Sequence, residues 1–151
     1  MKLALITGGA KRLGRVVTQA LAESGHHCLI HANTSAAEAA NLCAELSSQG
    51  VNAQYCLHAI ENPVAAADFL LNTALERFGQ LPTCSVLSAA SYSKDDPDQR
   101  LVDQLSQQLD LNFLFPVSYC TAMAERISTP VNGFHFPFKS GVGSLSIAFS
   151  G

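Results

Sequence analysis

Short apolar runs alternate with longer helical patterns through most of this 151-residue chain, and this alternation limits the possible folds most strongly. The four strands that we expect cover residues 2–7, 27–32, 51–59 and 83–88. The three helices between them cover residues 12–24, 35–49 and 63–78. Strands joined by helices through short connections form parallel β-α-β units with right-handed crossovers. The sequence therefore predicts one doubly wound, Rossmann-type α/β fold.

The second part of the chain continues this pattern less regularly. A polar loop at 93–98 precedes one long helical pattern at about 99–127, which Pro116 is expected to break. Residues 128–143 have the composition of an irregular loop, and 144–150 alternate like a fifth strand. Because a complete sheet of this kind has six strands in the order 3-2-1-4-5-6, the predicted sheet is incomplete at the C-terminus. We divide the chain into a Rossmann-like domain at 1–127 and a loop with the last strand at 128–151.

Helix ends and buried faces are also predicted from the pattern. Gly25, Gly50 and Gly79 are placed to end the first three helices, and Asn62 with Pro63 opens the third. Ser35 and Glu38 have the spacing of a capping box, in which each side chain binds a free backbone N–H. The expected buried positions are Leu13, Val16, Val17, Ala20 and Leu21 in the first helix, Leu71, Leu75 and Phe78 in the third, and Leu101, Leu105, Leu109, Phe113, Val117, Cys120 and Ala124 in the long one.

Composition excludes several classes of protein. The net charge is −3 and charged residues make up 14% of the chain, so the sequence lacks the basic surface of a nucleic-acid-binding domain. No apolar run reaches the ~18 residues of a membrane span, and the N-terminus does not resemble a signal peptide. Five cysteines without a Cys-x-x-Cys motif are expected to be reduced thiols of a cytoplasmic protein.

Three further groups of residues have an ordinary interpretation beside a functional one. His27 and His31 lie on one face of a strand but lack further ligands, so we predict no metal site. The acidic residues at 95–98 lack the glycine and final glutamate of a calcium loop and are expected to be solvated. The three phenylalanines at 134–138 either fold back over the core or form an exposed partner-binding strand.

The turn between the first strand and the first helix carries the most specific motif. It reads Thr-Gly-Gly-Ala-Lys-Arg-Leu-Gly, from Thr7 to Gly14. Glycines at such a turn let the backbone approach a pyrophosphate, whose charge then lies at the N-terminus of the helix. A glycine turn alone can be merely a tight turn, but here strand, turn and helix follow in the order that phosphate binding requires.

This turn resembles that of the short-chain dehydrogenase/reductase family, Thr-Gly-x-x-x-Gly-x-Gly, with Arg12 in place of the middle glycine. The Arg variant is similar to pteridine reductases. Asn112 followed by Pro116 resembles the family's Asn-x-x-x-Pro helix, and residues 143–150 resemble its fifth strand, which ends on a catalytic Ser, here Ser150. The resemblance implies that Asn112 positions a water in a proton relay and that Ser150 orients the substrate. The cofactor-binding residues that it implies are Gly8, Lys11, Arg12, Leu13, Gly14, Asn33, Thr34, Ser35 and Ala90.

The sequence also departs from the family pattern. The family's proton donor is a Tyr followed four residues later by a Lys, and neither Tyr55, Tyr92 nor Tyr119 has such a Lys. After the fourth strand the chain reads Ser-Ala-Ala-Ser at 88–91, without the family's two amides. Ala59, Ser93 and Thr34 stand where relatives carry the Asp that binds the adenine amine, an aromatic that stacks on pterin, and an Arg for the 2′-phosphate. We therefore expect the chain to be catalytically incomplete.

The choice of cofactor and of function follows from these residues. No acid ends the second strand, where it would repel a 2′-phosphate, and Lys11 and Arg12 are cations in the turn, so NADP(H) is favoured over NAD(H). The alternative is that both cations are only solvated. The chain is predicted to be the NADP(H)-binding portion of a pteridine-reductase-like oxidoreductase. The other hypothesis is a non-catalytic interaction protein that pairs through its long helix with itself or with an intact relative.

Overall fold

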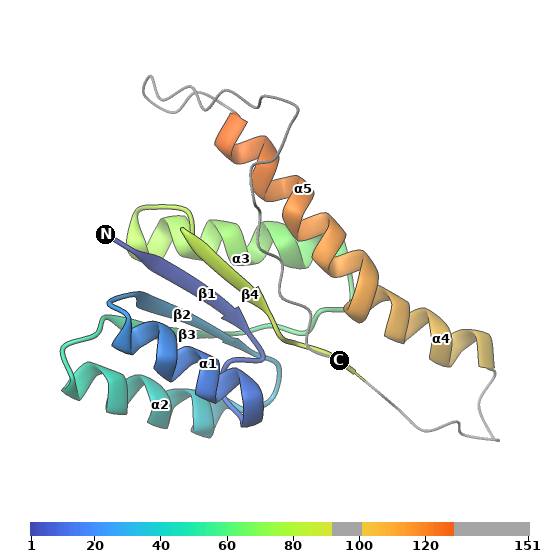
Figure 1. Cartoon of the computed structure of the whole chain (residues 1–151). Coiled ribbons are helices and arrows are strands. Elements are labelled where there is room, and N and C mark those ends of the chain that lie inside the picture. The colour runs from blue at the N-terminus through green and yellow to red at the C-terminus, as the bar shows by residue number, and fades with distance from the viewer. Residues whose placement is uncertain (92–100, 129–151) are drawn as a thin grey trace.

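The computed structural model describes residues 1–91 and 101–128. Four parallel strands form one sheet in the order β3-β2-β1-β4 (Figure 1). The strands are β1 (Leu3–Thr7), β2 (His27–Ala32), β3 (Ala53–Leu57) and β4 (Cys84–Leu87). This order is that of the first four strands of a dinucleotide-binding sheet, and the predicted doubly wound α/β class is confirmed. The expected loop at 93–98 and the expected fifth strand at 144–150 lie outside the described residues.

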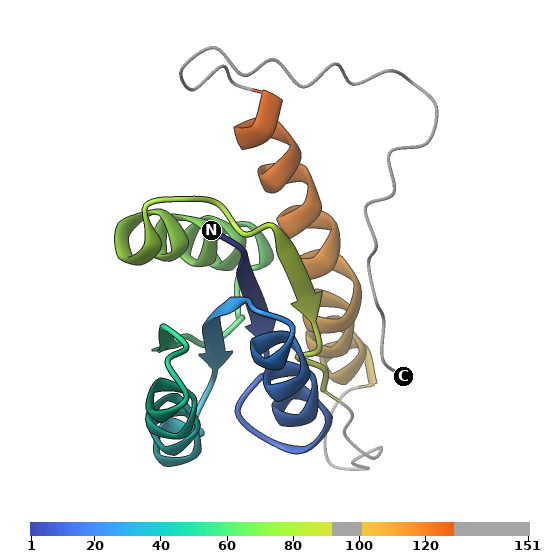
Figure 2. The ribbon, with the colours of Figure 1, turned by 60° about the vertical axis from the view of Figure 1, so that its left-hand side comes forward.

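Helices cover both faces of the sheet (Figure 2). α1 (Arg12–Glu23) and α2 (Ala36–Ser48) lie on one face, and α3 (Pro63–Phe78) and α5 (Phe115–Ser128) lie on the other. Side chains alternate along β1, so that Leu3 and Leu5 pack toward α3 and α5, whereas Ala4 and Ile6 pack toward α1 and α2. Because both faces are covered, all five residues of β1 are buried, as the centre of a parallel sheet requires.

The buried face of α1 differs from the prediction. Its buried residues are Gly14, Thr18 and Ala22, whereas Leu13 and Val16 are exposed. These three small residues are spaced by four, and they let the helix lie close to the strands beneath it. Of the other predicted residues, Leu21 packs against the core and Val17 is half-buried, whereas Ala20 is exposed. The prediction was therefore only partly right, because close approach to the sheet selects side-chain size as well as hydrophobicity.

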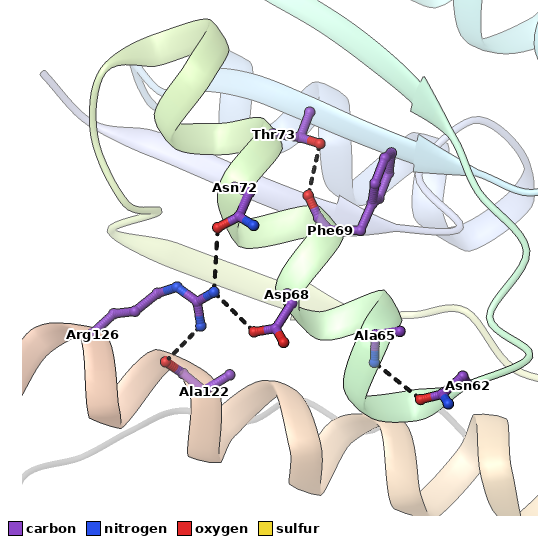
Figure 3. A network of polar contacts seen from close by, with 8 residues as sticks. All are labelled: Asn62, Ala65, Asp68, Phe69, Asn72, Thr73, Ala122 and Arg126. Carbon is purple, nitrogen blue, oxygen red and sulfur yellow. Dashed lines mark hydrogen bonds and ion pairs between the residues drawn. The ribbon is translucent and has the colours of Figure 1, made fainter.

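Most of the predicted helix ends are confirmed. Gly25, Gly50 and Gly79 all have positive φ, and the Asn62 side chain accepts a hydrogen bond from Ala65 N at 3.0 Å (Figure 3). The predicted capping box is wrong, because Ser35 makes no side-chain cap. Glu38, the predicted second residue of the capping box, instead forms an ion pair with Lys11 of the β1–α1 turn.

The predicted long helix is broken just before Pro116, as expected. It consists of α4 (Leu101–Leu109), the π-helical turn η1 (Asp110–Leu114) and α5. In η1 the N–H of Phe115 donates to the carbonyl of Asp110, five residues back. The residues that face the core are Phe115, Tyr119 and Met123, so the predicted buried face is wrong. Leu105, Leu109, Phe113 and Val117 are instead exposed.

The packing of α5 on α3 holds the second layer together. Phe115, Tyr119 and Met123 join Leu70 and Leu71 in one hydrophobic cluster. A polar network closes the edge of this contact, where the guanidinium of Arg126 donates to Asp68 Oδ1 at 2.8 Å, to Asn72 Oδ1 at 3.3 Å and to the Ala122 carbonyl at 3.2 Å (Figure 3). The expected burial of Leu75 is wrong, because it lies on the outer side of α3.

Two general features of the chain are clear. The five cysteines are unpaired thiols, of which Cys28, Cys43 and Cys56 are buried. Burial raises the pKa of both Cys28 and Cys56 to about 11, so these thiols are protonated and unreactive at neutral pH. In the described part of the chain, no helix combines the length and the apolar character that crossing a bilayer needs.

Candidate functional site

A cavity of about 660 Å³ opens at the edge of the sheet where all four strands end. This is the edge at which ligands bind in open parallel sheets. Its walls come from the β1–α1 turn, from the segments that follow β2, β3 and β4, and from η1. The lining residues are Gly8, Lys11, Arg12, Leu13, Gly14, His31, Asn33, His58, Ala59, Ile60, Glu61, Ser88, Ala89, Ala90, Ser91 and Leu111.

The β1–α1 turn is packed closely around its glycines, most severely at Gly14. A Cβ on Gly14 would lie 2.1 Å from the carbonyl oxygen of Gly8, and a Cβ on Gly8 would lie 3.2 Å from the backbone of Ala89. Gly8 also has φ +65°, a conformation that favours glycine. The hydroxyl of Thr18 donates within this turn, where the carbonyls of Gly9 and Gly14 lie 3.1 and 2.8 Å away. The turn is thus a rigid backbone cradle.

The N-terminus of α1 faces this cavity. Arg12, Leu13 and Gly14 are the first three residues of the helix, and all three line the cavity. The first N–H groups of a helix have no partner within it, and the helix dipole adds partial positive charge at this end. The arrangement can therefore hold an anionic group such as a phosphate.

The two cations of the turn differ in their surroundings. Lys11 Nζ lies 2.7 Å from Glu38 Oε1, and this hydrogen bond holds the pKa of the Glu38 carboxyl below its usual range. Among the described residues, no ion pair engages Arg12, which lines the cavity with φ +49°. Within the described residues, Arg12 is thus the turn cation whose charge is not offset by an acidic side chain. Its left-handed backbone conformation is strained.

The ends of β2 and β3 form the opposite wall. His31 is buried, and its Nε2 lies 2.9 Å from the carbonyl of His58, whose ring stacks on Phe69 at 4.2 Å between centroids. Asn33 lines this wall, whereas Thr34 and Ser35 are not among the lining residues. The sequence interpretation missed His31 as a site residue. The available signal was a histidine within an otherwise apolar, buried strand.

The segment after β4 is fixed by two hydrogen-bonded clamps. Ala89 N donates to Thr7 Oγ1 at 3.0 Å, which ties the segment to β1. Asn112 accepts from Ser91 N at 3.0 Å through Oδ1 and donates to the Ser91 carbonyl at 2.8 Å through Nδ2. Asn112 therefore joins η1 to the segment that carries Ala90, and its neighbour Leu111, rather than Asn112 itself, lines the cavity.

Of the other predicted catalytic group and the three tyrosines, Tyr55 and Tyr119 lie within the described residues. Ser150 and Tyr92 lie outside the described residues. Tyr119 is buried between α5 and the sheet, where its hydroxyl lies 2.7 Å from Ser85 Oγ and burial raises its pKa. Neither Tyr119 nor Tyr55 lines the cavity. The described part of the cavity thus contains binding groups and lacks a phenolic proton donor.

Comparison with known proteins agrees with this geometry. The family model described as the KR domain matches residues 3–112. Pteridine reductase 1 from Leishmania tarentolae is 36% identical over 95 residues, which make up 60% of this chain and 31% of that protein.

Solved structures extend the similarity to the fold. A short chain dehydrogenase from Burkholderia cenocepacia, in complex with NADP, gives a TM-score of 0.74 at 26% identity and covers 82% of this chain and 50% of that one. FolM alternative dihydrofolate reductase 1 from Brucella canis, complexed with NADP, gives a TM-score of 0.70 at 23% identity, with 82% and 48% covered. The chain spans about half the length of these solved structures.

Proposed function

Because this chain belongs to the KR-domain family of short-chain dehydrogenases and reductases, we propose that it is the NADP(H)-binding portion of a pteridine-reductase-like oxidoreductase. The observation that carries the proposal is the β1–α1 turn. A Cβ on Gly14 would overlap the Gly8 carbonyl, and the turn opens with the first residues of α1 onto a cavity of about 660 Å³. A cradle of this shape fits a pyrophosphate.

The residues around the cavity have distinct roles in this proposal. Gly8, Leu13 and Gly14 let the pyrophosphate approach the backbone, and Arg12 pairs with a phosphate oxygen. Ala90 lines the cavity beyond the turn. When bound, the cofactor supplies hydride chemistry at its nicotinamide. The chain's own residues bind and orient it.

The preference for NADP(H) over NAD(H) rests on charge near the end of β2. The residues after β2 are Asn33, Thr34 and Ser35, none of them acidic. The relative from Burkholderia cenocepacia, 26% identical, is described in complex with NADP. Lys11 supports the preference less than Arg12 does, because Glu38 already holds its ammonium group.

Catalysis by this chain alone is not part of the proposal. No Tyr-x-x-x-Lys stands in the 151 residues, and the amide of Asn112 is committed to the backbone of Ser91. We propose that Asn112 acts as a positioning residue, which holds the segment with Ala90 at the cavity. The five unpaired thiols support a cytoplasmic location within the same proposal.

Isothermal calorimetry with NADPH and NADH tests the proposal. We expect NADPH to bind more tightly than NADH, and Arg12→Ala to weaken NADPH binding by ~1–2 kcal/mol, the scale of one charge-assisted hydrogen bond. Lys2→Ala is the matched control, because Lys2 precedes β1 at the opposite edge of the sheet. Equal affinity for the two cofactors contradicts the 2′-phosphate argument, and no binding of either contradicts the proposed function.

A second candidate function is association with another protein chain, favoured by the outer side of α4, η1 and α5. Leu105, Leu109, Phe113 and Val117 are spaced by four and are 48, 55, 59 and 49% exposed. Such a continuous apolar stripe is typical of an interaction surface. Sedimentation analysis tests it, because Phe113→Glu should convert an oligomer to a monomer. A wild-type chain that is already monomeric at high concentration contradicts self-association.

A further inference from the structure

The outer edge of β3 is a surface that the proposed cofactor site does not use, since no residue of β3 lines the cavity. β3 lies at one side of the sheet, and within the described residues it pairs with β2 alone (Figure 1). Its sequence, Ala-Gln-Tyr-Cys-Leu, contains no charged residue and no proline. An uncharged edge strand presents backbone N–H and C=O groups with which a strand of another chain can pair.

The direction of each backbone group on β3 follows from the hydrogen bonds between β2 and β3. Cys28 N donates to the Asn52 carbonyl at 3.0 Å. His58 N donates to the Ala32 carbonyl, also at 3.0 Å. Even-numbered residues of this segment therefore turn their backbone groups toward β2, and successive residues of a strand alternate in this respect. The odd-numbered residues turn theirs to the open edge, with Tyr55 at the centre.

Arg77 occupies the central acceptor of this edge. Its Nη1 atom donates to the Tyr55 carbonyl oxygen at 2.6 Å. Arg77 belongs to the last turn of α3, on one face of the sheet, so its side chain extends from that face to the edge of the strand. A guanidinium has only donors, and its hydrogen bond to a carbonyl is charge-assisted. Pairing with another strand needs a backbone N–H at this same oxygen, in the space that the guanidinium fills.

The contact with Tyr55 is also what fixes the position of the Arg77 side chain. Within residues 1–91 and 101–128, no ion pair engages Arg77, whereas Arg15 and Arg126 are each held by a carboxylate. The guanidinium of Arg77 is thus directed by a backbone carbonyl of the edge strand and not by an acidic side chain.

We propose that Arg77 is a blocking residue, which keeps the β3 edge of one chain from pairing with β3 of a second copy. Two identical strands that pair antiparallel about a twofold axis at Tyr55 exchange hydrogen bonds between the two Tyr55 residues. Each chain has to give up its Arg77 contact for this pairing, so the contact is lost twice in each dimer. Leu57, which is 43% exposed at the end of β3, otherwise favours association at this edge. The inference is independent of the proposed cofactor binding.

Sedimentation velocity of the full chain over a concentration series tests the block. Arg77→Met keeps an unbranched apolar side chain and removes the guanidinium. It should lower the concentration at which half of the chain is associated by roughly 10- to 100-fold, the effect of one hydrogen bond to a charged group. Lys2→Met is the matched control, because it removes one positive charge from an exposed residue ahead of β1. Equal association of the two variants contradicts the block.

A second substitution separates blocking from a loss of stability. Leu57→Lys places a new cation at the same edge, where charged side chains oppose strand pairing. The double variant Arg77→Met/Leu57→Lys should therefore return to the association of the wild-type chain. Thermal melts establish that each variant is folded. A folded double variant that still associates like Arg77→Met contradicts the proposal.

Hydrogen exchange locates the contact between the copies. In Arg77→Met, the amides of Tyr55 and Leu57 should exchange more slowly at high than at low protein concentration, because the second strand then accepts hydrogen bonds from them. Slower exchange at Cys84 and Val86 places the contact at the β4 edge instead, and slower exchange confined to α4 and α5 places it on the apolar stripe. Either of these two results contradicts a block by Arg77 and leaves the proposed cofactor binding untouched.

Discussion

Gly14→Ala is the substitution that tests the architecture of the turn most severely. Gly14 lies in the first turn of α1, where alanine is ordinarily the better helix former by about 1 kcal/mol. A methyl group there would lie 2.1 Å from the Gly8 carbonyl oxygen, 2.8 Å from its carbon and 3.0 Å from Gly9 Cα. All three neighbours are backbone atoms, so no side-chain rotation relieves the overlap and the turn itself must move.

The expected size of the effect follows from these opposing terms. Overpacking a tight site costs about 1–3 kcal/mol and more where the backbone is displaced. This cost exceeds the helix-propensity gain, so we expect Gly14→Ala to lower the free energy of unfolding by about 1–3 kcal/mol. For a chain of about 150 residues, that corresponds to a fall in Tm of roughly 2–12 °C. Binding of NADPH should be lost as well, because the displaced Gly8 carbonyl belongs to the cradle.

Urea unfolding followed by circular dichroism measures the stability, and calorimetry measures the binding. Gly50→Ala is the control, because Gly50 has φ +81° but nothing within 4 Å of an added Cβ. It should cost only ~1–2 kcal/mol of left-handed strain and leave NADPH affinity unchanged. If Gly14→Ala instead stabilises the chain, as it would at an open helical position, the close contact between α1 and the turn is refuted.

Three further predictions concern single charges and the buried histidine. Arg12→Gly should raise the free energy of unfolding by up to about 1 kcal/mol, because glycine adopts the left-handed backbone conformation of this position without the strain that a Cβ causes. The same substitution should weaken the binding of NADPH, because it removes the guanidinium. Urea titration measures the stability and calorimetry the binding, and a less stable variant contradicts the strain at Arg12. Glu38→Gln should increase the affinity ratio of NADPH to NADH, because it releases Lys11; an unchanged ratio shows that Lys11 does not reach the 2′-phosphate. Burial lowers the pKa of His31 in the folded chain below the unfolded-state His value of about 6.5. Below this pH the unfolded chain binds more protons than the folded chain, so the free energy of unfolding should fall as the pH drops. Thermal melts between pH 7.5 and pH 5.5 measure this slope, which should be shallower in His31→Gln, and identical slopes contradict a neutral buried ring.

The sequence predicted the parts of the fold that local chemistry determines. The strand at 27–32, the start of the third helix at Asn62 and Pro63 and the glycine ends of three helices depend on neighbouring residues, and all were confirmed. The glycine turn was recognised for the same reason, since its motif is contiguous in the sequence.

The failures all arose where distant segments meet. The buried face of α1 is set by how closely the sheet approaches Gly14, Thr18 and Ala22, which hydrophobic periodicity does not report. The capping box failed because Ser35 makes no side-chain cap, and the Glu38 carboxylate forms an ion pair with Lys11 of the distant β1–α1 turn.

The apolar stripe of the long helix was read correctly as a stripe and wrongly as buried. Its residues from Leu105 to Val117 lie on the side of α4 and α5 that faces away from the sheet. Periodicity shows that apolar residues share a face, but it does not distinguish a buried face from an exposed one. His31 was missed for a similar reason, because its partner geometry exists only in the folded chain.

A crystal structure of the chain with NADPH tests the central claim most directly. The account predicts the pyrophosphate at the N-terminus of α1, with its oxygens about 2.7–3.2 Å from backbone N–H groups of Leu13 or Gly14, and the adenosine against the wall that contains His31. A structure grown at saturating NADPH with the dinucleotide elsewhere on the chain, or with an ordered and empty cradle, would contradict it.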